Sequence, residues 1–364
     1  MTVRAESDFA DDILGSLDGG ELNGLIAGLT DEQYDLFGGR DFVSVVSGIL
    51  SGELRLDFSD VLSFVLSAVG SSLSSLAALL ASVVGIAVVC SATGAFGGGR
   101  TEGVRKAVHF AAAACITVVA GIAAMSMFVM CADTLSALSA QINVLAPLLL
   151  TLMAGTGGTN TASVFSPTVS VLTSGLFNLI SSVLMPMLIA AFVFGAIAGI
   201  TGEDGLGKMS SFMRSSVKWL FGTGFFLLSA VMSVQGITAS VFDGLSVRGA
   251  KFAIGKYVPV IGGYMSDGFN LIVSGGIAVR NALGYAALLL LLLTILPAVM
   301  QIAVFALCLK LAAALTEPLG GGVIGGVLQN MGKTASLAGG VMFGAGFLHF
   351  VFVLILMAAG NVFI

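Results

Sequence analysis

Residues 283–309 decide the fold, and they read LGYAALLLLLLTILPAVMQIAVFALCL. The run contains no acidic or basic side chain, and it is longer than the about 20 apolar residues that cross a bilayer core as a helix. It therefore predicts a membrane-spanning helix. Apolar runs of similar length surround it in the chain. We place the runs at 73–95, 107–131, 134–154, 161–181, 183–201, 219–242, 258–279, 283–311 and 335–360.

The composition excludes a water-soluble enzyme. Of the 364 residues, 57% are hydrophobic and 10% are charged, whereas soluble domains average about 45–50% apolar and about 25% charged residues. Such a chain lacks the polar side chains that would cover a water-exposed globule. We therefore predict an all-α, polytopic helical membrane protein with about seven to nine apolar segments.

The charges divide the chain into two parts. Residues 1–60 hold thirteen acids and three bases, whereas 61–364 carries a basic excess. We predict that 1–60 is an acidic, extracytoplasmic helical segment and that 61–364 is the transmembrane helical domain. The loops at 96–106 and 202–218 are rich in Lys and Arg, and such loops stay in the cytoplasm. No basic n-region followed by an apolar h-region opens the chain, so either a signal peptide precedes it or its first span inserts unaided.

Residues 107–201 and 219–311 are candidates for a weak internal parallel repeat, and the alternative is that proline and glycine are simply common in membrane helices. In each half, proline and glycine interrupt neighbouring apolar segments, a pattern typical of the broken helices of transporters. The stretches at 134–181 and 258–279 are therefore candidates for re-entrant hairpins. The expected helix breaks are at Pro147, Gly155, Gly157, Gly158, Pro259, Gly262, Gly263 and Pro318.

Polar side chains gather beside these breaks. Charges at membrane depth are costly and usually face a cavity or a partner, so two interpretations stay open: a polar pathway, or structural ion pairs with snorkelling at the interface. We expect 147–160 and 259–268 to line one polar cavity, and Asp243, Arg248 and Lys251 to hold one another inside the protein. The candidate residues are Asp243, Arg248, Lys251, Lys256, Asp267, Asn270, Thr156, Thr159 and Asn160.

The sequence offers no recognisable residue set for catalysis, metal binding or cofactor binding. The four cysteines form no C-x-x-C pair. His109 and His349 stand alone in apolar runs, where a histidine more often bonds a neighbouring helix. We expect no enzyme, no cofactor, no metal site and no nucleic-acid partner, with membrane lipid as the surroundings.

Four segments together resemble one known family in their content and order. They are 145–158 (LAPLLLTLMAGTGG), 235–263 (QGITASVFDGLSVRGAKFAIGKYVPVIGG), 317–322 (EPLGGG) and 358–362 (AAGNV). From about residue 50 to the C-terminus, the chain resembles the stage III sporulation protein AE family. The segment at 235–263 is the most specific of the four.

The resemblance implies a polytopic subunit in the mother-cell membrane that surrounds the forespore. Its implied partners are the other stage III sporulation A complex proteins, which form a secretion channel or feeding tube between the two cells. That channel supports forespore maintenance and late gene expression. Whether the chain also assembles with further copies of itself stays open. The family supplies no catalytic or ligand-binding residues. The alternative is a stand-alone, secondary-type permease that binds a small solute at the midplane between repeats.

Overall fold

In the computed structural model, the described residues are 19–37, 39–53, 58–95, 102–202, 204–257, 262–317 and 322–358. Their regular secondary structure is entirely helical, which confirms the all-α prediction. Three short helices come first: α2 (Gly19–Ile26), α3 (Asp31–Leu36) and α4 (Phe42–Leu50). The long elements that follow are α5 (Phe58–Ala95), α6 (Glu102–Gly155), α7 (Thr159–Ser170) with the π-helical η1 (Val171–Phe177) and η2 (Ile180–Leu184), α8 (Met185–Thr201), α9 (Asp204–Tyr257), α10 (Gly262–Thr316) and α11 (Gly322–Ala358).

Six helical segments of the described chain are long and apolar enough to cross a membrane, as expected for a polytopic protein. The number is lower than the predicted seven to nine because neighbouring apolar runs join into single helices. The runs 107–131 and 134–154 both belong to α6, and 283–311 shares α10 with most of 258–279. The charged residue Asp133 interrupts the apolar sequence between these two runs. Its side chain is exposed, however, and helix α6 continues through it. Within the described residues, helices therefore occupy most of the stretches expected to form re-entrant hairpins.

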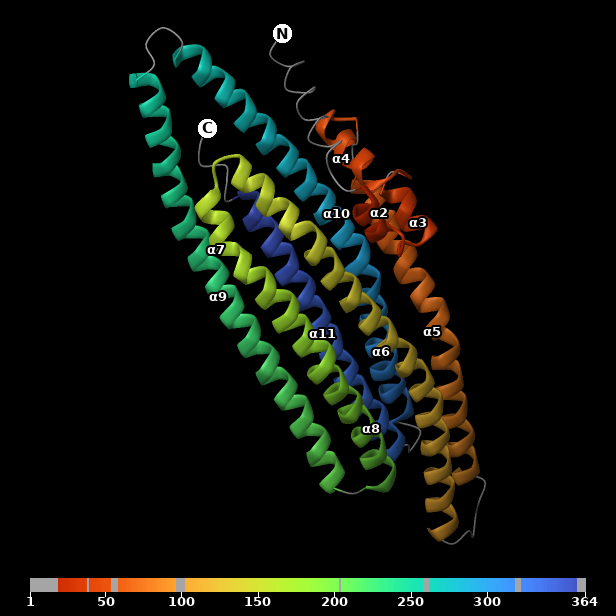
Figure 1. Ribbon diagram of the computed structural model, residues 1–364. Helices are drawn as coiled ribbons and strands as arrows, with labels where there is room; N and C mark the ends of the chain where they lie inside the picture. The colour runs from red at the N-terminus through yellow and green to blue at the C-terminus, as the bar shows by residue number, and fades with distance from the viewer. Residues whose placement is uncertain are drawn as a thin grey trace.

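Consecutive long elements run in opposite directions (Figure 1). The end of α5 and the start of α6 lie at the same end of the bundle as the end of α8 and the start of α9 (Figure 1). The basic side chains that begin α6 and α9 thus share one end, as their assignment to one side of the membrane requires. That this end faces the cytoplasm stays a prediction.

Helix α11 lies in the middle of the bundle and contacts α6, α8, α9 and α10 (Figure 1). Close approach to its backbone depends on glycine. A Cβ added to Gly199 of α8 would lie 2.8 Å from the Cα of Val327 in α11, closer than real Cβ atoms come. Small residues allow such contacts between membrane helices, where van der Waals packing drives association.

Four glycines of α11 recur every seven residues and face α10. A Cβ on Gly346 would lie 2.7 Å from Cγ1 of Ile295, and a Cβ on Gly339 would lie 3.2 Å from Cγ2 of Ile302. A seven-residue repeat keeps one helix face against its partner, so these glycines define the seam between α10 and α11. They are Gly325, Gly332, Gly339 and Gly346.

A short motif occurs twice and packs against itself. Phe221–Phe225 of α9 reads FGTGF, and Phe343–Phe347 of α11 reads FGAGF. The rings of Phe225 and Phe347 stack with centroids 6.2 Å apart. A Cβ on Gly344 would lie 2.6 Å from Cζ of Phe221, so this glycine makes the space that the ring occupies.

The described part of the acidic N-terminal segment packs against the bundle beside α10 (Figure 1). Phe37 and Phe42 are fully buried, and the Gln33 side chain donates from Nε2 to the carbonyl oxygen of Leu293 at 2.8 Å. Thr30 caps α3, since its side chain accepts from the backbone N–H of Gln33. The segment is therefore anchored to the transmembrane helices, while its extracytoplasmic location stays a prediction.

Two helical hairpins of the structure run in the same direction. Helices α6 and α9 have 54 residues each, and each is followed by a helical element that returns through the bundle (Figure 1). Both begin on an acid, a glycine and an aliphatic residue, Glu102-Gly-Val and Asp204-Gly-Leu. This geometry supports the parallel duplication, which stays a prediction. The prolines of the two halves do not fall at equivalent positions when the helices are aligned. Pro147 precedes the end of α6, whereas Pro259 follows the end of α9.

Candidate functional site

The first expected helix break, Pro147, is not a break. It lies inside α6, which continues to Gly155. Proline removes one backbone donor and its ring crowds the preceding turn, but Pro147 and Asn143, whose carbonyl loses that donor, are both on the exposed side of the helix. Membrane helices tolerate proline in such positions, and the prediction of a break at Pro147 was wrong.

The glycines at 155–158 do end the helix. Gly155 is the last residue of α6, Gly157 has φ of 97°, and Gly158 precedes the first residue of α7. Positive φ is readily adopted only by glycine. The Gly158 N–H donates to the carbonyl oxygen of Met153 at 2.9 Å, which closes the turn.

The three uncharged candidates beside this turn lie in different surroundings. Thr156 is 5% exposed and its Oγ1 donates to the carbonyl oxygen of Met153 at 3.0 Å. Thr159 and Asn160 are exposed on the first turn of α7. A Cβ on Gly276 of α10 would lie 2.5 Å from Cγ2 of Thr156, so the threonine packs directly against α10.

The second expected break lies between α9 and α10. Helix α9 ends at Tyr257, and Gly262 and Gly263 are the first residues of α10. Pro259 and Pro318 lie outside the described residues. Because Thr156 packs beside Gly276, the turn after α6 lies about 21 Å along α10 from Gly262, at 1.5 Å per residue. A polar cavity shared by the two breaks stays a prediction.

The charged candidates belong to one helical hairpin. Asp243, Arg248, Lys251 and Lys256 lie on the last third of α9, and Asp267 and Asn270 lie near the start of α10. These parts of α9 and α10 extend beyond the turn between α6 and α7 (Figure 1). The side chains of all six lie outside the described part of the structure, so their ion pairing stays a prediction.

A polar layer inside the bundle was not predicted. Gln141 of α6 is 2% exposed and donates from Nε2 to Oγ1 of Thr294 in α10 at 2.8 Å. His349 of α11 is fully buried one turn beyond Gly346, which packs on Ile295. We call Gln141, Thr294 and His349 the mid-bundle polar layer.

Two members of this layer retain hydrogen-bonding capacity. Among the described residues, no partner contacts Oε1 of Gln141 or either ring nitrogen of His349. This differs from the expected interhelical bond of His349. Buried polar atoms usually have hydrogen-bond partners. This layer is therefore where the bundle interior could form a hydrogen bond with water or with a solute. The signal was present in the sequence as isolated polar residues in apolar runs.

Two arginines tie helices together. Arg280 of α10 is fully buried and donates from Nη2 to the carbonyl oxygen of Met357, near the end of α11, at 3.0 Å. Arg214 of α9 donates from Nη1 to Oγ of Ser210 at 2.6 Å and reaches Oγ1 of Thr334 in α11 at 3.4 Å. Ser210 in turn donates to the carbonyl oxygen of Ala191 in α8 at 2.6 Å.

Metal-binding chemistry finds no support in the described residues. No group of three or more His, Cys, Asp or Glu side chains there could hold an ion. The four cysteines are free thiols, and Cys90 contacts Nδ1 of His109 through its Sγ at 3.5 Å.

Comparison with known families settles the relationship of this chain. The model of the family described as stage III sporulation protein AE matches residues 40–360. The chain belongs to this family. The match runs from the segment before α4 through α11 and so includes all six apolar helical segments.

A curated family member gives the same result at lower coverage. The stage III sporulation protein AE of Bacillus subtilis (strain 168) is 28% identical over 232 residues, which are 63% of this chain and 57% of that protein. The matched region thus spans a little over half of the relative's length. No solved structure matches the chain.

Proposed function

We propose that this chain is an integral membrane subunit of the sporulation-specific channel that links mother cell and forespore. It resides in the mother-cell membrane around the forespore and assembles with other stage III sporulation A proteins. Its loss blocks forespore maintenance and late gene expression. The observation that carries the proposal is the stage III sporulation protein AE match over every apolar helical segment.

The packing of the bundle favours a subunit over a self-contained transporter. Helix α11 fills the middle of the bundle, and a glycine seam brings it close to α10. Three cavities among the described residues are lined mainly by apolar side chains, and they lie in grooves between helices. A permease is expected to bind its solute between repeats through polar groups at the midplane, and these three cavities offer few.

One observation favours the permease as a second candidate. The hairpins formed by α6 with α7–α8 and by α9 with α10 run in the same direction (Figure 1). For a permease, the mid-bundle polar layer would be the source of hydrogen-bonding atoms for the solute. In that case the purified chain alone moves a small solute across a liposome membrane.

A deletion strain of the source organism tests the proposal. Cells that lack the chain are expected to reach engulfment and then fail to express a late forespore reporter, and a tagged copy is expected to restore expression. The tagged copy is expected to surround the forespore on its mother-cell side. Normal reporter expression in the deletion strain would overturn the proposal.

A further inference from the structure

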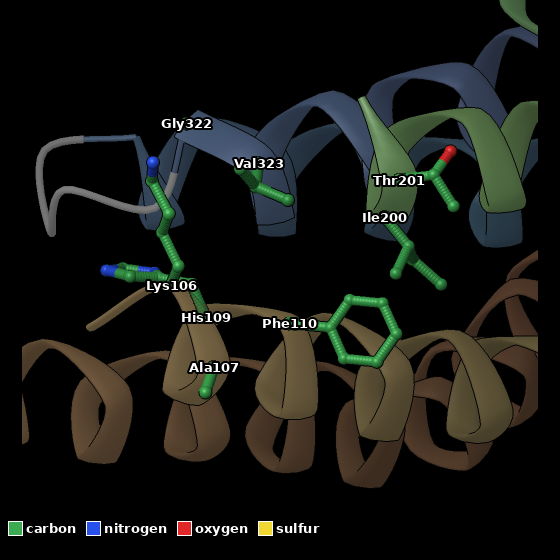
Figure 2. Close-up of a pocket in the computed structure, with 8 residues that line it drawn as sticks. All are labelled: Lys106, Ala107, His109, Phe110, Ile200, Thr201, Gly322 and Val323. Atoms are coloured by element: carbon green, nitrogen blue, oxygen red, sulfur yellow. The ribbon is translucent and has the colours of Figure 1, made fainter. Parts of the chain in front are cut away.

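A cavity of about 790 Å³ lies at the end of the bundle that carries the basic loops. Lys106, His109 and Phe110 of α6 form one wall, and Ile200 with Thr201 at the end of α8 and Gly322 at the start of α11 form the other. Figure 2 shows Lys106 reaching from α6 toward the first residues of α11, with the Phe110 ring facing Ile200. We call this space the basic cavity.

The charge of the basic cavity favours an anion. Lys106 and His109 are the two residues of its lining that carry basic nitrogens, and the sequence from 96 to 106 contains three bases, Lys106 among them, and one acid. The Nδ1 of His109 contacts Cys90 of α5 at 3.5 Å, so this imidazole lies at the α5 side of the cavity and Lys106 is the side chain that reaches toward α11 (Figure 2). On the predicted orientation this end meets the cytoplasmic leaflet, whose anionic headgroups attract basic residues.

A separate apolar groove of about 490 Å³ lies further along the same two helices, from Thr117 on α6 and Ile197 on α8. Gly121, Met125 and Phe128 of α6 face Phe192 and Ile197 of α8 across it. The two helices are antiparallel, so Phe110 lies opposite Ile200 while Phe128 lies opposite Phe192, whose ring centroid is 5.9 Å away. The groove therefore follows the basic cavity along the helix pair.

The distance from the basic cavity to the apolar groove matches the length of one phospholipid. Lys106 and Gly121 are separated along α6 by about 22 Å, at 1.5 Å per residue. Half of a bilayer with its headgroups is about 20–22 Å thick. A headgroup in the basic cavity would thus place the end of its acyl chain at Gly121, in the near end of the groove. Met125 is exposed beside the groove, which leaves a side entrance from the bilayer.

We propose that the basic cavity and the near end of the apolar groove together bind one anionic phospholipid, with its phosphate at Lys106 and the end of an acyl chain at Gly121. The bound lipid covers the gap between α6 and the α8–α11 pair at the basic end. The site depends on neither the proposed channel role nor the partner proteins.

Lipid binding to the purified protein tests the site. Native mass spectrometry compares phosphatidylglycerol with phosphatidylcholine of identical acyl chains. The wild-type protein is expected to prefer phosphatidylglycerol. Lys106→Gln is expected to weaken phosphatidylglycerol binding about fivefold, the effect of one basic side chain at a membrane surface, and to leave phosphatidylcholine unchanged.

A second variant tests the groove. No heavy atom lies within 4 Å of a Cβ added to Gly121 or to Gly85, and Gly85 lies in a different cavity between α5 and α6. Both Gly121→Leu and Gly85→Leu are therefore expected to fold. Gly121→Leu should weaken both lipids, whereas Gly85→Leu and the exposed-lysine control Lys333→Gln should bind them as the wild type does.

Three results would overturn the proposal. The first is equal binding of the two lipids by the wild type, and the second is an equal loss in Lys106→Gln and Lys333→Gln. The third concerns the source of the phosphate: displacement of the lipid by millimolar inorganic phosphate, with normal lipid binding by Gly121→Leu, would show a site for a soluble anion.

Discussion

Arg280 holds the end of α11 through Met357: its Nη2 donates to the Met357 carbonyl oxygen at 3.0 Å. The last carbonyls of a helix lack partners within the helix, and a cation there also offsets the negative end of the helix dipole. Gly284, one turn along α10, leaves room for the Met357 side chain. The arginine at a membrane helix interface is thus a structural cap on a helix end.

Arg280→Met is expected to destabilise the protein. The substitution keeps much of the side-chain volume but removes the charged donor, and hydrogen bonds to charged groups contribute about 1.5–3 kcal/mol. A lower thermal midpoint and a smaller yield in fluorescence-detected size exclusion are expected. Lys333→Met is the matched control, because Lys333 is exposed and its Nζ donates to Oε1 of Gln329, one turn away on the same helix. Equal stability of the two variants would refute the cap.

The glycine seam of α11 gives a position-specific prediction. A leucine at Gly346 meets Ile295 of α10, whereas a Cβ at Gly340 of the same helix has no heavy atom within 4 Å. Overpacking of a close contact costs about 1–3 kcal/mol. Gly346→Leu should therefore lower the thermal midpoint clearly and Gly340→Leu should not. If both variants unfold at the same temperature, the seam does not set the packing.

The bond between Gln141 and Thr294 should be measurable as a coupling energy. A cycle of Gln141→Leu, Thr294→Val and the double variant isolates the pair. Interhelical hydrogen bonds in a membrane protein contribute about 0.6 kcal/mol on average and about 1.7 at most, so we expect a coupling in that range from reversible unfolding in detergent. Strictly additive effects would mean that the two side chains do not interact.

The charged end of α9 carries a prediction that the described side chains do not test. If Asp243 and Arg248 hold each other inside the protein, removal of one partner leaves a buried charge, which costs about 3–5 kcal/mol. Asp243→Ala or Arg248→Ala should then reduce the amount of protein in the membrane. The double variant should recover part of it. Normal accumulation of both single variants would show that this helix end faces solvent.

The orientation can be checked by cysteine accessibility in a background free of the four native cysteines. A cysteine at Glu102 or Lys208 is expected to resist a membrane-impermeant reagent added outside, because both positions lie within the first two turns of helices that begin at the basic end. A cysteine at Asp31 in α3 is expected to react. Labelling of position 102 from outside would reverse the assignment.

The sequence predicted the features that hydropathy and glycine chemistry determine. Apolar runs located every long helix, and glycines 155–158 marked a true turn because Gly157 needs a positive φ. Hydropathy could not show that α6 passes through Asp133 and Pro147, since both lie on its exposed side and an α-helix needs no apolar residue there.

The site was less predictable because its contacts join distant segments. Gln141 and Thr294 are 153 residues apart, and Arg280 meets Met357 across 77 residues. One sequence gives the polarity of each residue but not which helices are neighbours. The FGTGF and FGAGF motifs can be seen in the sequence. The stacking of Phe225 on Phe347, however, follows only from the placement of α9 beside α11.

The most direct test of the account asks whether the chain works within a complex or alone. A tagged copy is purified in mild detergent from sporulating cells and, in parallel, reconstituted by itself into liposomes with a panel of small solutes. We predict that the stage III sporulation A proteins copurify with it in a fixed ratio and that the liposomes stay impermeable. A chain that purifies without these proteins and transports a solute by itself would contradict the account.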